Sequence, residues 1–190
     1  MIRMLLLTIL AALAFPFGEL ALSASPVLDY CGKQLPADLV LRLNHAYPGY
    51  RAPRSTDNLA EDIARNLANG GTGCLGVAQG NFRGSGHRGL VIALTALRGD
   101  AYIILVAARS AESWDVSELI RDSDGRQRLY IDPTPAGHYD HVESYDPDPS
   151  KGELASLDCP DPGVVIGATE ATGDVYCIVR GSWQHVPIID

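Results

Sequence analysis

The chain has 190 residues, with 23 acidic and 15 basic side chains and a formal net charge of −8. Such an acidic balance argues against nucleic acid as a partner, because binding phosphates needs a positively charged face. The length is sufficient for one domain that buries a hydrophobic core of its own.

Residues 1–23 have the features of a secretory signal peptide. Arg3 precedes an apolar run over 4–14, and small residues then lead to a predicted cleavage after Ser23. The apolar run is about half of the roughly 20 residues that a membrane-spanning helix needs. We therefore expect a periplasmic or secreted protein without a membrane anchor, in which residues 24–190 form a single domain.

Helical periodicity is found next, in two short segments. The first covers about 36–46, and the second begins at Ser55 or Thr56, either of which could cap it, and ends at 70–71. The second segment places Leu59, Ile63 and Leu67 on one stripe. We expect both helices to pack their apolar stripes against a sheet.

Strand patterns follow. Residues 90–94 and 102–106 are apolar and rich in β-branched residues, which predicts a central hairpin. Further strands are predicted at 114–120, 128–131, 164–167 and 175–179, whereas 132–159 is rich in Pro, Asp, Gly and Ser and is predicted as a long surface loop with at most short strands. Helices followed by antiparallel strands predict an α+β fold, with two N-terminal helices packed on a mainly antiparallel sheet.

The turn of the predicted hairpin is Arg98-Gly99-Asp100, which is also a cell-adhesion tripeptide. A turn between two buried strands explains these three residues without any receptor. The sequence alone therefore assigns them no function.

The four cysteines predict two disulfides, because an even number in an exported chain is usually oxidised. Their spacing matches no zinc pattern. Three pairings are possible. We favour Cys31 with Cys74 and Cys159 with Cys177, since each loop then closes within one half of the chain.

The segment GNFRGSGHRG at 80–89 contains the pattern G-x-G-x-x-G of dinucleotide-binding loops. That motif needs a helix N-terminus directly after the glycines to face the pyrophosphate. Here an apolar strand pattern follows. We therefore do not expect a dinucleotide site.

The same glycine-rich segment, followed by its apolar strand, resembles the calcium loop of FG-GAP or VCBS-like modules, in which GDFDGNGKPD precedes a strand. The C-terminal run at 175–186 also resembles the closing hairpin of small periplasmic proteins of this kind. The resemblance implies a single module in an exported protein, with oxygen ligands for calcium on the glycine loop.

This loop keeps the glycines of a calcium site and lacks its charged ligands. Ligands are expected at four alternate positions, with Gly86 allowing the turn, and the residues found there are Asn81, Arg83, Ser85 and Gly89. None of the four is a carboxylate, and one is a cation. We therefore expect a degenerate loop that binds no calcium, and no cofactor elsewhere.

A second group of polar residues offers an alternative site. His138 and His141 lie three residues apart with Glu143 nearby, so these side chains could ligate a divalent metal in a hydrolase. A polar loop rich in Asp also contains such pairs by chance. The sequence contains no G-x-S-x-G elbow, and no unpaired cysteine is expected. Nothing therefore favours nucleophilic catalysis.

The sequence therefore favours a non-enzymatic binding protein with a periplasmic or extracellular protein as its partner. One form of this hypothesis is an inhibitor or immunity-type protein acting on a basic cell-wall lytic enzyme, which the acidic surface would suit. The alternatives are the metal-dependent hydrolase and an accessory structural protein of the cell envelope.

Overall fold

A computed structural model describes residues 28–82, 88–111, 113–122, 128–142, 154–168 and 172–189. The predicted signal peptide lies outside these ranges. The elements are α1 (Ala37–Ala46), β1 (Tyr50–Arg51), the 3₁₀ turn η1 (Ser55–Asp57), α2 (Ala60–Ala68), β2 (Val77–Gly80), β3 (Gly89–Ala96), β4 (Tyr102–Arg109), β5 (Trp114–Asp122), β6 (Leu129–Thr134), β7 (Gly137–Asp140), β8 (Ser156–Cys159), β9 (Gly163–Ala168), β10 (Thr172–Val179) and β11 (Ser182–Ile189). No helix within the described ranges is long and apolar enough to cross a membrane.

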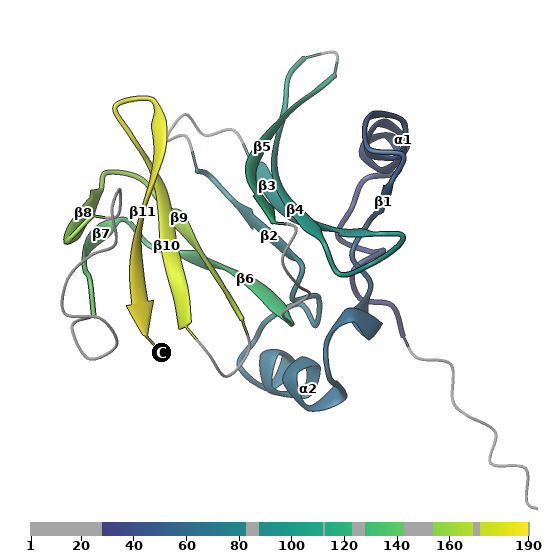
Figure 1. Cartoon of the computed structure of the whole chain (residues 1–190), viewed down its shortest axis with the longest axis horizontal. Coiled ribbons are helices and arrows are strands. Elements are labelled where there is room, and N and C mark those ends of the chain that lie inside the picture. The colour runs from purple at the N-terminus through teal and green to yellow at the C-terminus, as the bar shows by residue number, and fades with distance from the viewer. Residues whose placement is uncertain are drawn as a thin grey trace, which may run out of the picture.

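The strands form three antiparallel sheets. In the first, β1 and β2 pair with one edge of β3, and β4 and β5 follow on the other side; the second has the order β11-β10-β9-β6; the third is the hairpin of β7 and β8. The two larger sheets meet where the chain enters β2, since Ile131 N donates a hydrogen bond to Leu75 O at 2.8 Å. Figure 1 shows α1 outside the first sheet and the β7–β8 hairpin outside the second.

Three hydrophobic clusters separate these layers. Along β3, Leu90, Ile92 and Leu94 face α1 and its buried Leu39, whereas Val91 and Ala93 face the second sheet. Strand side chains alternate between faces, so a continuous apolar run supplies two cores at once. A third cluster, built on Val175, Cys177 and Val186, lies between the second sheet and the β7–β8 hairpin.

The predicted α+β class is wrong, because the fold is mainly β. The described chain has eleven strands and two α-helices of 10 and 9 residues. The segment 132–159, predicted as a long surface loop with at most short strands, completes β6 and contributes the four-residue strands β7 and β8. Strands of four residues are too short for their alternation to stand out in the sequence, so their positions were not predicted.

The hairpin predicted at 90–94 and 102–106 is confirmed, with β3 and β4 paired from Gly89 and Ala108 to Thr95 and Tyr102. The closing hairpin of β10 and β11 turns at Arg180 and Gly181, whose φ angles are 52° and 82°. Two consecutive positive φ angles are the signature of a type I′ turn, whose twist matches that of the strands.

The second helix differs from the prediction in both its start and its orientation. Ser55 opens the 3₁₀ turn rather than capping the helix, and α2 begins at Ala60. Of its residues only Asp62 is buried, while Leu59 and Leu67 are 40% and 39% exposed. The predicted packing of this apolar stripe against a sheet is therefore wrong.

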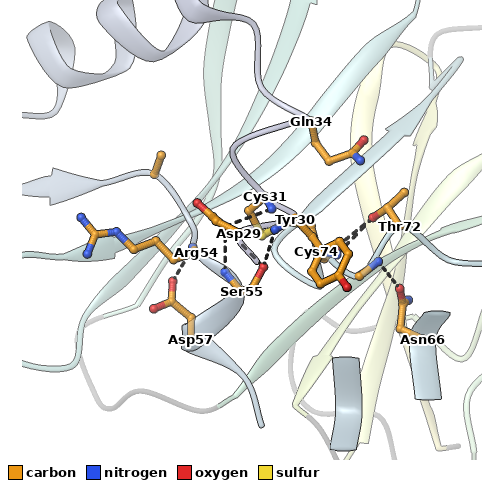
Figure 2. Close-up of a disulfide and its surroundings, with 12 residues drawn as sticks. Asp29, Tyr30, Cys31, Gln34, Arg54, Ser55, Asp57, Asn66, Thr72 and Cys74 are labelled. Carbon is orange, nitrogen blue, oxygen red and sulfur yellow. Dashed lines mark hydrogen bonds between the residues drawn. A yellow bond between two sulfur atoms is a disulfide. The ribbon is translucent and has the colours of Figure 1, made fainter. Parts of the chain in front are cut away.

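Ser55 is held by the N-terminal segment (Figure 2). Its hydroxyl accepts a hydrogen bond from Tyr30 N at 2.8 Å, and Asp29 Oδ1 accepts from the backbone N of Ser55 at 3.2 Å and of Cys31 at 3.1 Å. The disulfide between Cys31 and Cys74 fixes the same segment to the chain just before β2. This brace uses the Ser55 side chain, which explains why it caps no helix.

The second disulfide joins Cys159 at the end of β8 to Cys177 in β10. It ties the β7–β8 hairpin to the second sheet. Both bridges are those favoured by the sequence, and they are consistent with an exported protein, since disulfides persist in oxidising compartments.

Candidate functional site

The ends of the glycine-rich loop are organised by a buried aromatic ring. Gly80 and Gly89 are register partners in β2 and β3, and Phe82, which is 2% exposed, lies against both. A Cβ at Gly80 would lie 2.5 Å from Phe82 Cε1. These two glycines therefore make room for a core side chain.

The degenerate calcium-type loop is described only in part. Asn81 has a buried Oδ1 with no hydrogen-bond partner among the described residues, and Gly89 begins β3. Arg83, Ser85 and Gly86 lie outside the described residues, so the absence of calcium remains a prediction. A strand, not a helix, follows the glycines, as predicted from the apolar pattern after the loop.

His138 is hydrogen-bonded on both sides. Its Nδ1 lies 2.6 Å from Asp158 Oδ1 on β8, and its Nε2 lies 2.9 Å from Asp140 Oδ1 on β7, the strand of His138 itself. Carboxylate oxygens only accept, so both contacts together require the charged imidazolium. The hydrogen bond to Asp158, and then Asp140, raises the pKa of His138.

The structure does not bring His138 and His141 together as a site. His141 follows β7, and its backbone N donates to Ala155 O at 2.9 Å, which continues the ladder with β8. Residues three apart along an extended chain point to opposite sides. Glu143 lies outside the described residues, and among those described no group of three His, Cys, Asp or Glu side chains is placed to hold a metal ion.

A different set of polar residues converges between the two large sheets. We define the inter-sheet cluster as five side chains from strands β4, β5, β10 and β11: Tyr102, Asp122, Asp174, Tyr176 and His185. All are partly buried. They come from β4 and β5 at one end of the first sheet and from β10 and β11 at one end of the second.

On the second sheet, Asp174 organises the cluster. Its Oδ2 accepts hydrogen bonds from Tyr176 Oη at 3.2 Å and from His185 Nδ1 at 3.1 Å. Tyr176 and His185 are cross-strand partners, and their rings stack. With Nδ1 donating to the carboxylate, a neutral His185 has its lone pair on Nε2, so this nitrogen can accept a hydrogen bond from a partner.

On the first sheet, Tyr102 faces this group. Burial raises the pKa of Tyr102 to about 12, helped by a hydrogen bond to Asp122 and by the negative charges of Asp122 and Asp174. Tyr102 and Asp122 are cross-strand partners in β4 and β5, whereas Asp174 belongs to the opposite sheet. Two carboxylates, one from each sheet, thus raise the pKa of the same phenol.

Tyr102 also lines a small cavity of about 30 Å³. Asn58 borders the cavity, and its buried Oδ1 has no hydrogen-bond partner among the described residues. A space of this size holds about one water molecule, which could donate to that oxygen. The cavity is therefore too small for an organic substrate.

No motif in the sequence pointed to the inter-sheet cluster. Asp174 and Tyr176 alternate with the buried Val175 and Cys177, a pattern that places them on one face of β10. That alternation was the available signal. This alternation could not show that Tyr102 lies close to Asp174, because the packing of one sheet against another depends on residues far apart in the sequence.

We compared the chain with protein-family models, with curated proteins and with solved structures, and none of them matches it. The resemblance to FG-GAP or VCBS-like modules therefore stays a prediction.

Proposed function

We propose that the protein is an exported, non-enzymatic binding protein, and that its partner is a basic protein of the periplasm or extracellular space. The observation that carries this proposal is the inter-sheet cluster. Two carboxylates, two phenols and an imidazole converge between two sheets, and the side chains of Asp174 and His185 remain 29% and 35% exposed.

Such a cluster suits the side chain of a lysine or arginine from a partner. A cation placed there would meet the charges of Asp122 and Asp174 in a partly desolvated setting, where charge-assisted hydrogen bonds are strong. The rings of Tyr102 and Tyr176 offer faces for cation–π contact. Rigid strands hold these groups, so little entropy is lost when a partner binds.

The net charge of −8 supports a basic partner, because it would attract a positively charged protein over a distance. A cell-wall lytic enzyme of the lysozyme type has this charge, and an inhibitor of such an enzyme is the specific form of the proposal. The metal-dependent hydrolase has less support, since both ring nitrogens of His138 are already hydrogen-bonded.

The test is calorimetric titration of the purified protein with a basic lysozyme, together with an assay of cell-wall lysis. We expect binding that weakens as salt is added, and inhibition of lysis. Asp174→Asn should weaken binding at least tenfold. Asp161→Asn, which removes the same charge from the loop before β9, should change it much less.

The comparison of these two variants separates a site from a general charge effect. Equal losses for both would indicate unspecific attraction and contradict the role of the cluster. A lysozyme that neither binds nor loses activity would contradict the inhibitor form and leave the envelope structural protein as the better hypothesis.

A further inference from the structure

The turn between β3 and β4 presents two opposite charges at an exposed tip. We define the β3–β4 tip as residues 97–100, all of which are exposed. A hydrogen bond from Ala96 N to Ala101 O, 2.9 Å long, closes the loop. Gly99 has a φ of 74° and open space around the position of a Cβ, so Arg98 and Asp100 stand on either side of a residue in the left-handed region.

Neither charged side chain of the tip has a partner in the described part of the chain. Arg98 and Asp100 form no ion pair and no side-chain hydrogen bond there, in contrast to Arg51, Arg109 and Arg121, which are each paired with a carboxylate. Folding thus leaves the guanidinium and the carboxylate of the tip available to another molecule.

The tip is also held firmly. It connects two strands whose central residues are fully buried, and Leu97 N donates a hydrogen bond to Gly49 O at 2.9 Å, which braces the turn against the segment before β1. Loops on such rigid scaffolds are the usual places for binding residues. Leu97, 60% exposed, adds an apolar contact beside the charges.

We propose that the β3–β4 tip binds a cell-surface adhesion receptor that recognises Arg-Gly-Asp. The required chemistry is an acidic pocket for the Arg98 guanidinium and a protein-bound divalent cation that the Asp100 carboxylate ligates. This inference goes beyond the proposed function and shares with it only the export of the folded protein.

The experiment measures binding of the folded protein to an immobilised integrin ectodomain of the Arg-Gly-Asp-binding class, by surface plasmon resonance in manganese. We expect binding that is abolished by EDTA and displaced by a short linear Arg-Gly-Asp peptide. Asp100→Glu keeps the charge but moves the carboxylate by one methylene, and it should weaken binding at least tenfold, as should Arg98→Ala.

Arg180→Ala is the matched control, because Arg180 is an exposed arginine at the β10–β11 turn, and its loss should leave binding unchanged. No binding by the native protein, or binding that survives EDTA or Asp100→Glu, would overturn the proposal. The lysozyme titration run on the same samples keeps the two proposals apart. Lysozyme binding without integrin binding would reject only the proposal for the β3–β4 tip. Integrin binding without lysozyme binding would reject only the proposal of a basic protein partner.

Discussion

Tyr176 and His185 stack their rings with centroids 5.0 Å apart and planes 13° from parallel, and both side chains donate to one oxygen of Asp174. The stack fixes the imidazole against β10, and the shared carboxylate fixes its tautomer. The geometry makes the cluster a preformed surface.

The first prediction concerns Tyr102. Its pKa of about 12 lies above the ordinary value near 10, so the neutral phenol is favoured in the folded state. The resulting stability is present below pH 10 and is lost as the pH rises through 12. Asp122→Asn should lower this pKa, and a difference absorbance titration against Tyr102→Phe would measure it. A Tyr102 that titrates near pH 10 would contradict the packing of the two sheets.

The second prediction concerns His138. Its pKa is raised by Asp158 and Asp140, so the ion pairs are complete below the ordinary value near 6.5 and are lost as the pH rises through the raised pKa. Asp158→Asn should move this pKa downward, and Asp161→Asn should leave it in place. Proton NMR of the imidazole follows both variants. A His138 pKa that is insensitive to Asp158→Asn would show that the contact does not form in solution.

The third prediction concerns the disulfides, whose loops span 43 and 18 residues. Chain-entropy estimates give about 4 and about 3 kcal/mol for closing loops of these lengths. Replacing both cysteines of one bridge by alanine should lower the free energy of unfolding by amounts of this order, more for Cys31–Cys74. Guanidinium unfolding measures the losses. Thiol titration of the unfolded native protein, which should find no free thiol, provides the control.

The fourth prediction compares two glycines that each begin a strand. A Cβ at Gly163 would collide with the carbonyl oxygen of Tyr176, whereas a Cβ at Gly137 has nothing within 4 Å. Gly163→Ala should therefore cost about 1–3 kcal/mol of stability, the usual range for overpacking, and Gly137→Ala should cost little. Thermal unfolding decides between them. Similar melting temperatures for both variants would contradict the pairing of β9 with β10.

The fifth prediction concerns the glycine-rich loop. Millimolar calcium should leave the melting temperature unchanged, because a ligand that binds only the folded state must raise it. Asn81→Asp combined with Arg83→Asp and Ser85→Asp should create calcium-dependent stabilisation if the loop has calcium-loop geometry. Gly89 is left unchanged, since a Cβ there would lie 3.3 Å from Phe82 Cδ2. Stabilisation of the native protein by calcium would refute the claim that the site is lost.

The parts of the fold that the sequence predicted are those with strong local patterns. The β3–β4 hairpin was found because both strands are buried on two faces and therefore read as continuous apolar runs. The helix α2 has equally clear periodicity, yet it buries Asp62 and exposes Leu59 and Leu67. Periodicity shows that a helix has an apolar stripe, and tertiary packing decides where that stripe points.

The candidate site was harder to predict for a related reason. Asp174, Tyr176 and His185 belong to one hairpin, and their alternation places them on a common face. Tyr102 and Asp122 come from the other sheet, more than 50 residues earlier in the chain. The His138 and His141 pair was conspicuous in sequence, but His138 lies in β7 and His141 follows it, and the alternation of an extended chain separates the two rings.

Both disulfides join cysteines that are consecutive in the sequence, and this order matters for a chain that emerges from its N-terminus. Cys31 and Cys74 are both available before Cys159 has emerged, so the first two thiols are also the correct pair. Cys159 and Cys177, the last two cysteines to emerge, are likewise the correct pair. A chain with this order can oxidise as it emerges, without any step in which a wrong bridge has to be reshuffled.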